Sequence, residues 1–167
     1  MRLSQLAVEA LGYTLTLTGD CEIGSISADS REQTEQGLFF CIKGAHFDAH
    51  RFAPQAIKNG AVALVVSQLQ EDLDVPQLLV SNDRAAMALI ARAFYGFADQ
   101  QLKLIGITGT KGKTTTSYLV KAVLEAMGSI CGLIGTTGNM IGSQWMNSNL
   151  TTPDPIELHK TLRLMAD

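Results

Sequence analysis

The chain has 167 residues, of which 46% are apolar and 17% are charged, and its formal net charge is −3. This length supports one good hydrophobic core or two small ones, in a globular protein rather than a disordered or fibrous one. The acidic balance argues against nucleic acid as a partner, and the sequence contains neither a bilayer-length apolar stretch nor a signal peptide, so we expect a cytoplasmic protein without membrane contact.

The first hundred residues alternate between short apolar runs and helical apolar spacing. The expected strands are 14–18, 22–28, 38–42, 61–66 and 78–80, and the expected helices are 4–11, 52–57 and a third one that carries Met87, Ile90, Ala91 and Phe94 inward. Ser4 is a candidate N-cap of the first helix, Gly60 ends the second, and Ser81 or Asn82 caps the third. The polar stretch 99–101 marks a domain boundary, so we expect a small α/β domain at 1–100.

Residues 101–167 form a second unit, with a different order of expected strands and helices. A strand at 102–107, a helix ended by Gly128 and a strand at 130–134 predict one βαβ unit, hence a parallel sheet. Residues 138–147 suggest a loop or hairpin, and Asp154 with Glu157 marks a helix start. The apolar stripe expected on the inner face of the first helix is Leu119, Val120, Val123, Leu124 and Met127.

The most informative segment is 106–116, which reads Gly-Ile-Thr-Gly-Thr-Lys-Gly-Lys-Thr-Thr-Thr. A glycine-rich turn between a strand and a helix lets backbone N–H groups and the helix dipole face an anion. Lys113 can reach the β- and γ-phosphates, and the Thr114 hydroxyl can bind Mg²⁺. The general phosphate-loop pattern places its first glycine at residue 107, which is Ile107 here. A glycine-rich turn with an accidental lysine is the alternative, but the context predicts a nucleoside triphosphate site.

The cysteines and histidines predict neither disulfides nor zinc. Cys21, Cys41 and Cys131 are odd in number, far apart and set in apolar surroundings, and the three histidines show no metal-ligand spacing beside them. We therefore expect buried free thiols.

Several motifs in chain order resemble those of the Mur ligase family of cell-wall enzymes. In the second unit they are Gly-Thr-Lys-Gly-Lys-Thr-Thr-Thr (109–116), Gly-Leu-Ile-Gly-Thr-Thr-Gly-Asn (132–139) and Leu-Thr-Thr-Pro-Asp (150–154). In the first unit they are Ser27-Ala28-Asp29-Ser30-Arg31, the segment 37–44, Phe47-Asp48-Ala49-His50 and the segment 56–61. The resemblance covers essentially the whole chain. Within the family it is to the enzymes that add the third residue of the peptide, rather than to those that add the terminal dipeptide.

The resemblance implies a fold and a reaction. The family has a UDP-sugar-binding domain, which would be 1–100, and a central P-loop-type ATPase domain with a parallel sheet, of which 101–167 would be the first part. The implied reaction uses ATP and Mg²⁺ to join a diamino acid, meso-diaminopimelate or L-lysine, to UDP-MurNAc-L-Ala-D-Glu through an acyl phosphate. Peptidoglycan biosynthesis is the implied process.

The resemblance also implies roles for individual residues. Lys113 and Thr114 would be catalytic, with Thr114 also a Mg²⁺ ligand. The residues lining the phosphate nest would be Gly109, Thr110, Lys111, Gly112, Lys113, Thr114, Thr115 and Thr116. The substrate contacts would be Ala28, Ser30, Ala45, His46 and Phe47 at the uridine and Thr151 and Thr152 at the muramoyl-dipeptide.

Simpler interpretations stand beside these roles. Ser30 and Arg31 are also typical of a polar turn, the role of His46 rests wholly on the resemblance, and Thr151 and Thr152 could be no more than the lead-in to the helix after Asp154.

Three functions compete at this point. The second unit contains about half of a nucleotide-binding domain, so we expect an N-terminal piece of a longer ligase, inactive alone, whose uncovered apolar surface self-associates. The alternative is a nucleotide- or UDP-sugar-binding module without turnover. A small P-loop kinase is disfavoured, because its lid would be rich in arginine and residues 114–167 contain only Arg163.

Overall fold

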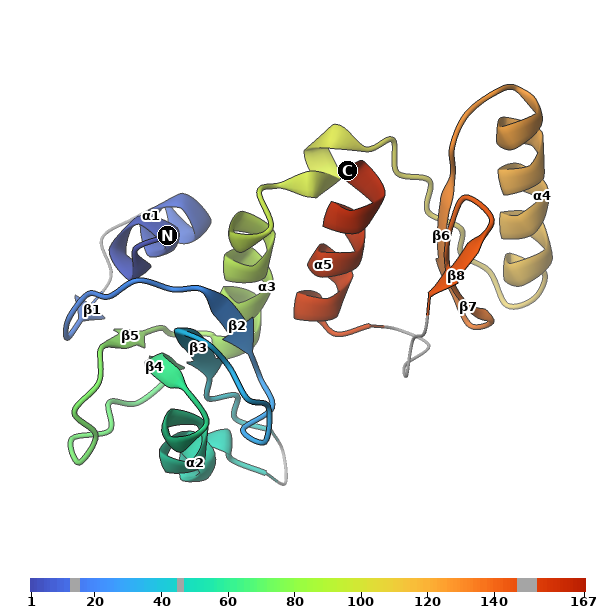
Figure 1. The fold of residues 1–167 in the computed structure, drawn as a ribbon. Helices are drawn as coiled ribbons and strands as arrows, with labels where there is room; N and C mark the ends of the chain where they lie inside the picture. Colours follow the sequence, from blue (N-terminus) through green and yellow to red (C-terminus); the bar gives the residue numbers. More distant parts are fainter. Residues whose placement is uncertain (13–15, 45–46, 147–152) are drawn as a thin grey trace. The chain divides into compact units, whose positions relative to one another are not determined.

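The structure is a computed structural model that describes residues 1–12, 16–44, 47–146 and 153–167 (Figure 1). The chain forms two compact units, Met1–Phe97 and Ala98–Asp167. No helix among the described residues is long and apolar enough to span a membrane. The function assigned to each unit stays a prediction.

Unit 1 is built on one sheet, as its alternating pattern predicted. Its strands are β1 (Thr16–Leu17), β2 (Ser25–Ser27), β3 (Gly37–Phe40), β4 (Ala61–Val66) and β5 (Gln77–Leu79). The spatial order is β1-β5-β4-β3-β2, in which β2 to β5 are parallel and β1 is antiparallel to β5. The central strands β3 and β4 are almost wholly buried, which explains their continuous apolar runs.

Helices cover both faces of this sheet. They are α1 (Leu3–Leu11), the 3₁₀ helix η1 (Ala49–Phe52), α2 (Ala53–Lys58) and α3 (Asp83–Phe94). Helix α2 packs on β4, and α1 packs on α3, and Figure 1 shows these two groups on opposite faces. Ala53 and Ala56 of α2 contact Phe39 and Leu64 in one core cluster. The predicted α/β class is therefore confirmed.

The ends of the unit 1 helices test the capping predictions. Asn82 caps α3, because its side chain accepts a hydrogen bond from the Ala85 N–H at 3.0 Å. Ser4 does not cap α1: the helix already begins at Leu3, and Asp20 accepts the Ser4 N–H at 3.0 Å. The prediction at Ser4 was wrong because the side chain that accepts from the first turn of α1 is Asp20, which is 16 residues further along the chain.

Unit 2 contains a three-stranded antiparallel meander flanked by helices. Its elements are η2 (Ala98–Gln101), α4 (Lys113–Ala126), β6 (Gly132–Gly135), β7 (Gly138–Ile141), β8 (Gln144–Met146) and α5 (Pro155–Ala166). The hairpin suggested for 138–147 is confirmed as β7 and β8, and its last residue, 147, lies outside the described residues. The Asp154 carboxylate accepts the Glu157 N–H at 2.9 Å, so the predicted cap of α5 is confirmed.

The parallel βαβ unit predicted at the start of unit 2 is wrong. Residues 102–107 form no strand, and Leu104 and Ile105 are exposed. The strand expected at 130–134 begins at Gly132 and pairs antiparallel with β7. A two-residue turn is enough to pair β6 with β7. A parallel pair needs a long crossover connection and helices on both faces of the sheet.

Helix α4 forms where the sequence predicts it, but only part of its expected apolar stripe faces inward: Val120 and Leu124 are half-buried, whereas the other three residues are exposed. Leu119, Val123 and Met127 are 63%, 59% and 77% exposed. They recur every four residues and therefore share one face of the helix. Without a strand at 102–107, this face of α4 has nothing within the described part of unit 2 to cover it.

The cysteines are free thiols, as predicted. Cys41 is buried, and desolvation raises the pKa of its thiol to about 12, so it stays protonated and unreactive at neutral pH. Cys21 and Cys131 are only half-buried, contrary to the expectation for all three.

Candidate functional site

The first candidate site lies at the carboxyl edge of the unit 1 sheet. Because β2 and β3 are parallel neighbours, the loops that follow them start side by side. Ala28 and Ser30 lie on the loop after β2, and Phe47 lies on the loop after β3. The two loops that carry these residues thus start from neighbouring strand ends. Ala45 and His46 lie outside the described residues.

Local hydrogen bonds shape the loop after β2. The Ser27 hydroxyl accepts the Asp29 N–H at 3.0 Å and donates to the Glu32 carboxylate. Arg31 donates from Nε and Nη2 to the two Asp29 oxygens, at 2.9 and 2.6 Å. The hydrogen bonds from the side chain and the backbone of Arg31 lower the pKa of Asp29 to about 2, so both groups are charged at neutral pH. The segment is the polar turn that its composition also suggested, with an exposed guanidinium at its end.

Hydrogen bonds to distant segments of the chain hold the loop after β3 in place. The Lys43 N–H donates to Asp83 at the start of α3, at 2.6 Å, and the Ser67 N–H donates to His50 Nε2 at 3.3 Å. The other ring nitrogen of His50 contacts Asp48 at 2.6 Å, and this hydrogen bond lowers the pKa of Asp48. The loops after three parallel strands are therefore tied to one another.

An aromatic pair is exposed on the same loop. The Phe47 and Phe52 rings stack with centroids 5.1 Å apart, and their residues are 58% and 39% exposed. Exposed rings of this kind offer a flat apolar surface on which a planar ligand can stack.

The second candidate site is the loop that enters α4 in unit 2. Gly109 and Gly112 have φ values of +154° and +79°, in the region that favours glycine. Gly112 is the N-cap residue, and because it has no side chain it leaves the first-turn N–H groups of α4 to an outside acceptor. All residues from 109 to 116 are exposed. This backbone is suited to an anion.

The side chains of the loop add a positive charge and hydroxyl groups. Lys113 Nζ donates to the Gly109 carbonyl at 2.6 Å, so the ammonium group lies over the loop. Thr114 Oγ1 lies 3.3 Å from Thr136 Oγ1, and Tyr118 Oη lies 2.9 Å from Thr137 Oγ1. An ammonium group beside a helix N-terminus is suited to bind a polyphosphate. The Thr114 hydroxyl oxygen is the kind of ligand that Mg²⁺ has in phosphate loops.

Sequence reasoning missed Thr136 and Thr137 as neighbours of this site. The turn between β6 and β7, where two hydroxyl residues stand between Gly135 and Gly138, places them opposite the start of α4. The paired hydroxyls between two glycines were the available signal. Thr151 and Thr152, predicted to hold the muramoyl-dipeptide, lie outside the described residues.

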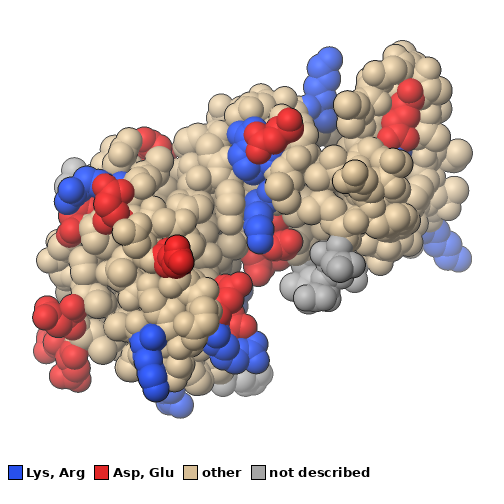
Figure 2. All heavy atoms as spheres, viewed as in Figure 1, with Lys and Arg blue, Asp and Glu red and all other residues tan. Residues whose placement is uncertain are grey.

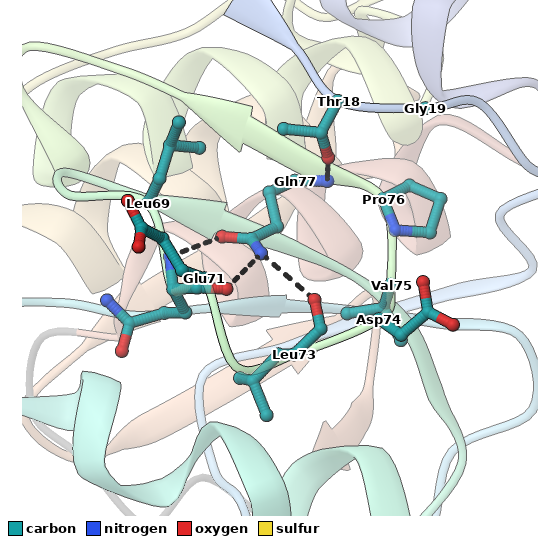
Figure 3. Close-up of a pocket in the computed structure, with 10 residues that line it drawn as sticks. Thr18, Gly19, Leu69, Glu71, Leu73, Asp74, Val75, Pro76 and Gln77 are labelled. Carbon is teal, nitrogen blue, oxygen red and sulfur yellow. Dashed lines mark hydrogen bonds between the residues drawn. The ribbon is translucent and has the colours of Figure 1, made fainter.

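A surface cavity of about 360 Å³ in unit 1 contains none of the predicted site residues (Figure 3). It is lined by Thr18, Gly19, residues 69–71 and residues 73–77. The Gln77 amide ties its loop together, accepting from the Gln70 N–H at 2.9 Å and donating to the Gln70 carbonyl at 2.8 Å. The hydrogen bonds of this buried amide are thus made within the protein itself.

Charge on the face shown in Figure 2 is mixed rather than concentrated. On the face that Figure 2 shows, Lys and Arg are interspersed with Asp and Glu and form no continuous basic surface. Among the described residues, no group of three or more His, Cys, Asp or Glu side chains is placed to hold a metal ion.

Comparison with known protein families gives two matches in chain order. Residues 22–95 match the model described as "Mur ligase family, catalytic domain". Residues 107–167 match the "Mur ligase middle domain". Each match falls within one of the two structural units.

Curated proteins with similar sequences are named for one reaction. The chain is 44% identical over 161 residues to a UDP-N-acetylmuramoyl-L-alanyl-D-glutamate–2,6-diaminopimelate ligase of Halalkalibacterium halodurans, covering 96% of the chain and 33% of that protein. It is 41% identical over its full length to the ligase of the same name from Geobacillus thermodenitrificans, 34% of which it covers. The chain thus spans about a third of the length of these relatives.

Solved structures share the fold. A structure of a UDP-N-acetylmuramoyl-L-alanyl-D-glutamate–2,6-diaminopimelate ligase matches 99% of the chain, and 34% of its own, with a TM-score of 0.71 and 24% identity. A crystal structure of MurF from Acinetobacter baumannii matches 96% of the chain, and 32% of its own, with a TM-score of 0.62 and 25% identity.

Proposed function

Because this chain belongs to the Mur ligase family, we propose that it provides the sugar-nucleotide and ATP-binding parts of a UDP-MurNAc-tripeptide synthetase. The observation that carries the proposal is the identity of 40–44% to curated diaminopimelate ligases over nearly the whole chain. The same comparison favours diaminopimelate over L-lysine as the added diamino acid. We also expect the protein to act in the cytoplasm.

In this proposal unit 2 binds the triphosphate of ATP. The N–H groups at the start of α4 and the Lys113 ammonium group would hold the phosphates, and Thr114 would provide a hydroxyl ligand for Mg²⁺. The remaining contacts would come from the nest residues Gly109, Thr110, Lys111, Gly112, Thr115 and Thr116. Lys113 supports this assignment because its Nζ already lies over the loop, 2.6 Å from the Gly109 carbonyl.

Unit 1 would bind the UDP-sugar at the carboxyl edge of its sheet. Ala28, Ser30 and Phe47 lie on adjacent loops there, and Phe47 presents an exposed ring to a planar base. Ala45, His46, Thr151 and Thr152 are assigned to the same substrate through the resemblance.

The chemistry follows from these assignments. When bound, ATP would transfer its γ-phosphoryl group to the D-glutamyl side-chain carboxylate, giving an acyl phosphate and ADP. The amine of diaminopimelate would then attack the acyl carbon, forming the amide bond and releasing inorganic phosphate. Positioning and charge neutralisation carry most of such a transfer. Lys113 and the helix N-terminus would neutralise the phosphates, and the loops of unit 1 would hold the acceptor.

Calorimetric titration of the chain tests the binding part of the proposal. We expect UDP-MurNAc-L-Ala-D-Glu to bind to unit 1 and a guanosine diphosphate sugar of similar size not to bind. Equal affinity for both, or binding of neither by the folded chain, would contradict the assignment of unit 1.

A ligation assay separates the ligase from a binding module without turnover. It should use the longest reading frame that contains these residues, because the chain spans a third of its relatives. Phosphate release should require UDP-MurNAc-L-Ala-D-Glu and diaminopimelate together, with L-lysine as the control amine. ATP hydrolysis that proceeds without either of the two substrates would contradict the proposed ligase activity.

A further inference from the structure

Asn59, at the C-terminal end of α2, contacts the loop that carries Ser30. Its side-chain Nδ2 donates to the Ser30 carbonyl at 2.9 Å, joining residues 29 positions apart in the sequence. A carbonyl can only accept, so the nitrogen of this amide must face Ser30. The amide oxygen accepts from Gln55 Nε2 at 3.2 Å, which is consistent with the same orientation.

The backbone of Asn59 holds the other end of the same loop. Its carbonyl accepts from the Thr34 N–H at 2.8 Å and from the Thr34 hydroxyl at 3.3 Å. The next residue, Gly60, has φ +100°, and a Cβ there would overlap the Thr34 carbonyl. The loop after β2 is therefore packed against the end of α2 at both Ser30 and Thr34.

Helix capping does not explain why this residue is asparagine. Asn59 has φ −92° and ψ 16°, outside the left-handed region in which asparagine is favoured at helix ends. Its capping bonds are made by its backbone N–H, to Gln55 and Ala56, which any residue but proline provides. The side-chain amide contacts Gln55 on its own helix, and its bond to another segment of the chain is the one to Ser30.

We infer that Asn59 is a positioning residue of the sugar-nucleotide site, fixing the peptide group that follows Ser30 and so the direction in which Ser30 faces its ligand. The inference rests on the proposed function of unit 1. No residue of α2 needs to touch the ligand for this role. Asn59 acts through the loop, by its hydrogen bond to the Ser30 carbonyl.

The substitution Asn59→Asp tests this role with little change in shape. It places a carboxylate oxygen against the Ser30 carbonyl, so that a hydrogen bond becomes a contact between two acceptors. Gln55→Ala is the matched control, because it removes the other side-chain contact of Asn59 and leaves the bond to Ser30. We expect the dissociation constant of UDP-MurNAc-L-Ala-D-Glu to rise about tenfold in Asn59→Asp and about twofold or less in Gln55→Ala.

Two further readouts separate positioning from a general loss of stability. The Arg31 amide shares its peptide group with the Ser30 carbonyl, so its ¹⁵N resonance should shift in Asn59→Asp and not in Gln55→Ala. Protonation of the introduced carboxyl group restores a donor, so affinity in Asn59→Asp should recover towards wild type as the pH is lowered. Titrations run well below the unfolding temperature of each variant keep unfolded protein out of the comparison.

The outcomes distinguish this inference from the proposed function. If the wild-type chain binds the ligand and Asn59→Asp binds it equally well, the positioning role is wrong while the site stands. If the wild-type chain does not bind the ligand, the proposed function of unit 1 fails. The Arg31 resonance still reports in that case, and an unchanged resonance in Asn59→Asp would overturn the positioning role by itself.

Discussion

At the scale of single residues, we expect ATP binding at the 109–116 loop to depend on Lys113 more than on its neighbour Lys111. Both are exposed, but Lys113 begins α4 and lies over the loop through its bond to Gly109. A positive charge at this point adds to the field of the helix N-terminus, where an anion would bind.

The substitution Lys113→Ala should therefore weaken ATP binding by at least about tenfold, because a charge-assisted contact to phosphate is lost. Binding of UDP-MurNAc-L-Ala-D-Glu, assigned to unit 1, should stay within twofold of wild type. Lys111→Ala is the control and should change ATP affinity much less, because it keeps the loop backbone and removes only an exposed side chain. Calorimetry with each ligand separately provides the measurement, and equal loss of both affinities would show that the two sites are not independent.

At the scale of elements, α1 is held by an acid outside the helix. Asp20 accepts from the Ser4 N–H at 3.0 Å, the Ser4 hydroxyl at 2.8 Å and Arg2 Nε at 2.7 Å. The Ser4 backbone bond and the Arg2 side chain are the main causes that lower the pKa of Asp20 from 3.8 to about 2. The charged form of Asp20 thus docks the first turn of α1.

This pKa shift predicts how stability depends on pH. A carboxylate whose pKa is lower in the folded state stabilises the fold above pH 3.8 and loses that contribution as the pH falls from 3.8 to about 2. Asp20→Asn should remove this part of the pH dependence and lower the unfolding temperature at pH 7 by about 3 °C.

Glu9→Gln is the matched control, since Glu9 lies on the same helix and contacts only Gln5 among the hydrogen bonds described for it. Thermal unfolding followed by circular dichroism between pH 2 and 7 gives the comparison. A curve for Asp20→Asn that parallels wild type through this range would contradict the role of Asp20.

At the scale of the whole molecule, the two units differ in how well they bury their apolar residues. The sheet of unit 1 is covered on both faces, whereas α4 of unit 2 exposes Leu119, Val123 and Met127, and Ile130 beyond its end is 88% exposed. Exposed apolar side chains that share one helix face, as those of α4 do, favour association.

We expect the chain to self-associate through this face of α4, in a concentration-dependent way. Leu119→Ser combined with Val123→Ser should shift sedimentation towards the monomer, because both side chains lie on the exposed stripe. Leu89→Ser is the control, since Leu89 is a partly exposed leucine of α3 in unit 1, outside that stripe. A strictly monomeric wild type with exchange-protected amides throughout 103–167 would contradict the expectation.

Local features were predictable from the sequence. The strands and helices of unit 1, the helix start at Asp154 and the glycine-rich entry to α4 all depend on apolar runs, on capping groups within three residues or on the conformational freedom of glycine. Lys113 and Thr114 could be chosen as candidates because the loop that carries them is contiguous. The class of the fold followed from the same local patterns.

The tertiary structure decided what joins distant segments. That Asp20 rather than Ser4 caps α1, that Asn59 holds Ser30, and that Thr136 faces Thr114 all follow from how the backbone closes on itself. The same holds for β6, which has the apolar run of a buried parallel strand but pairs antiparallel with β7. An apolar run states only that a segment prefers burial, and the partner that provides it depends on which neighbour can be reached at the lowest cost in chain entropy.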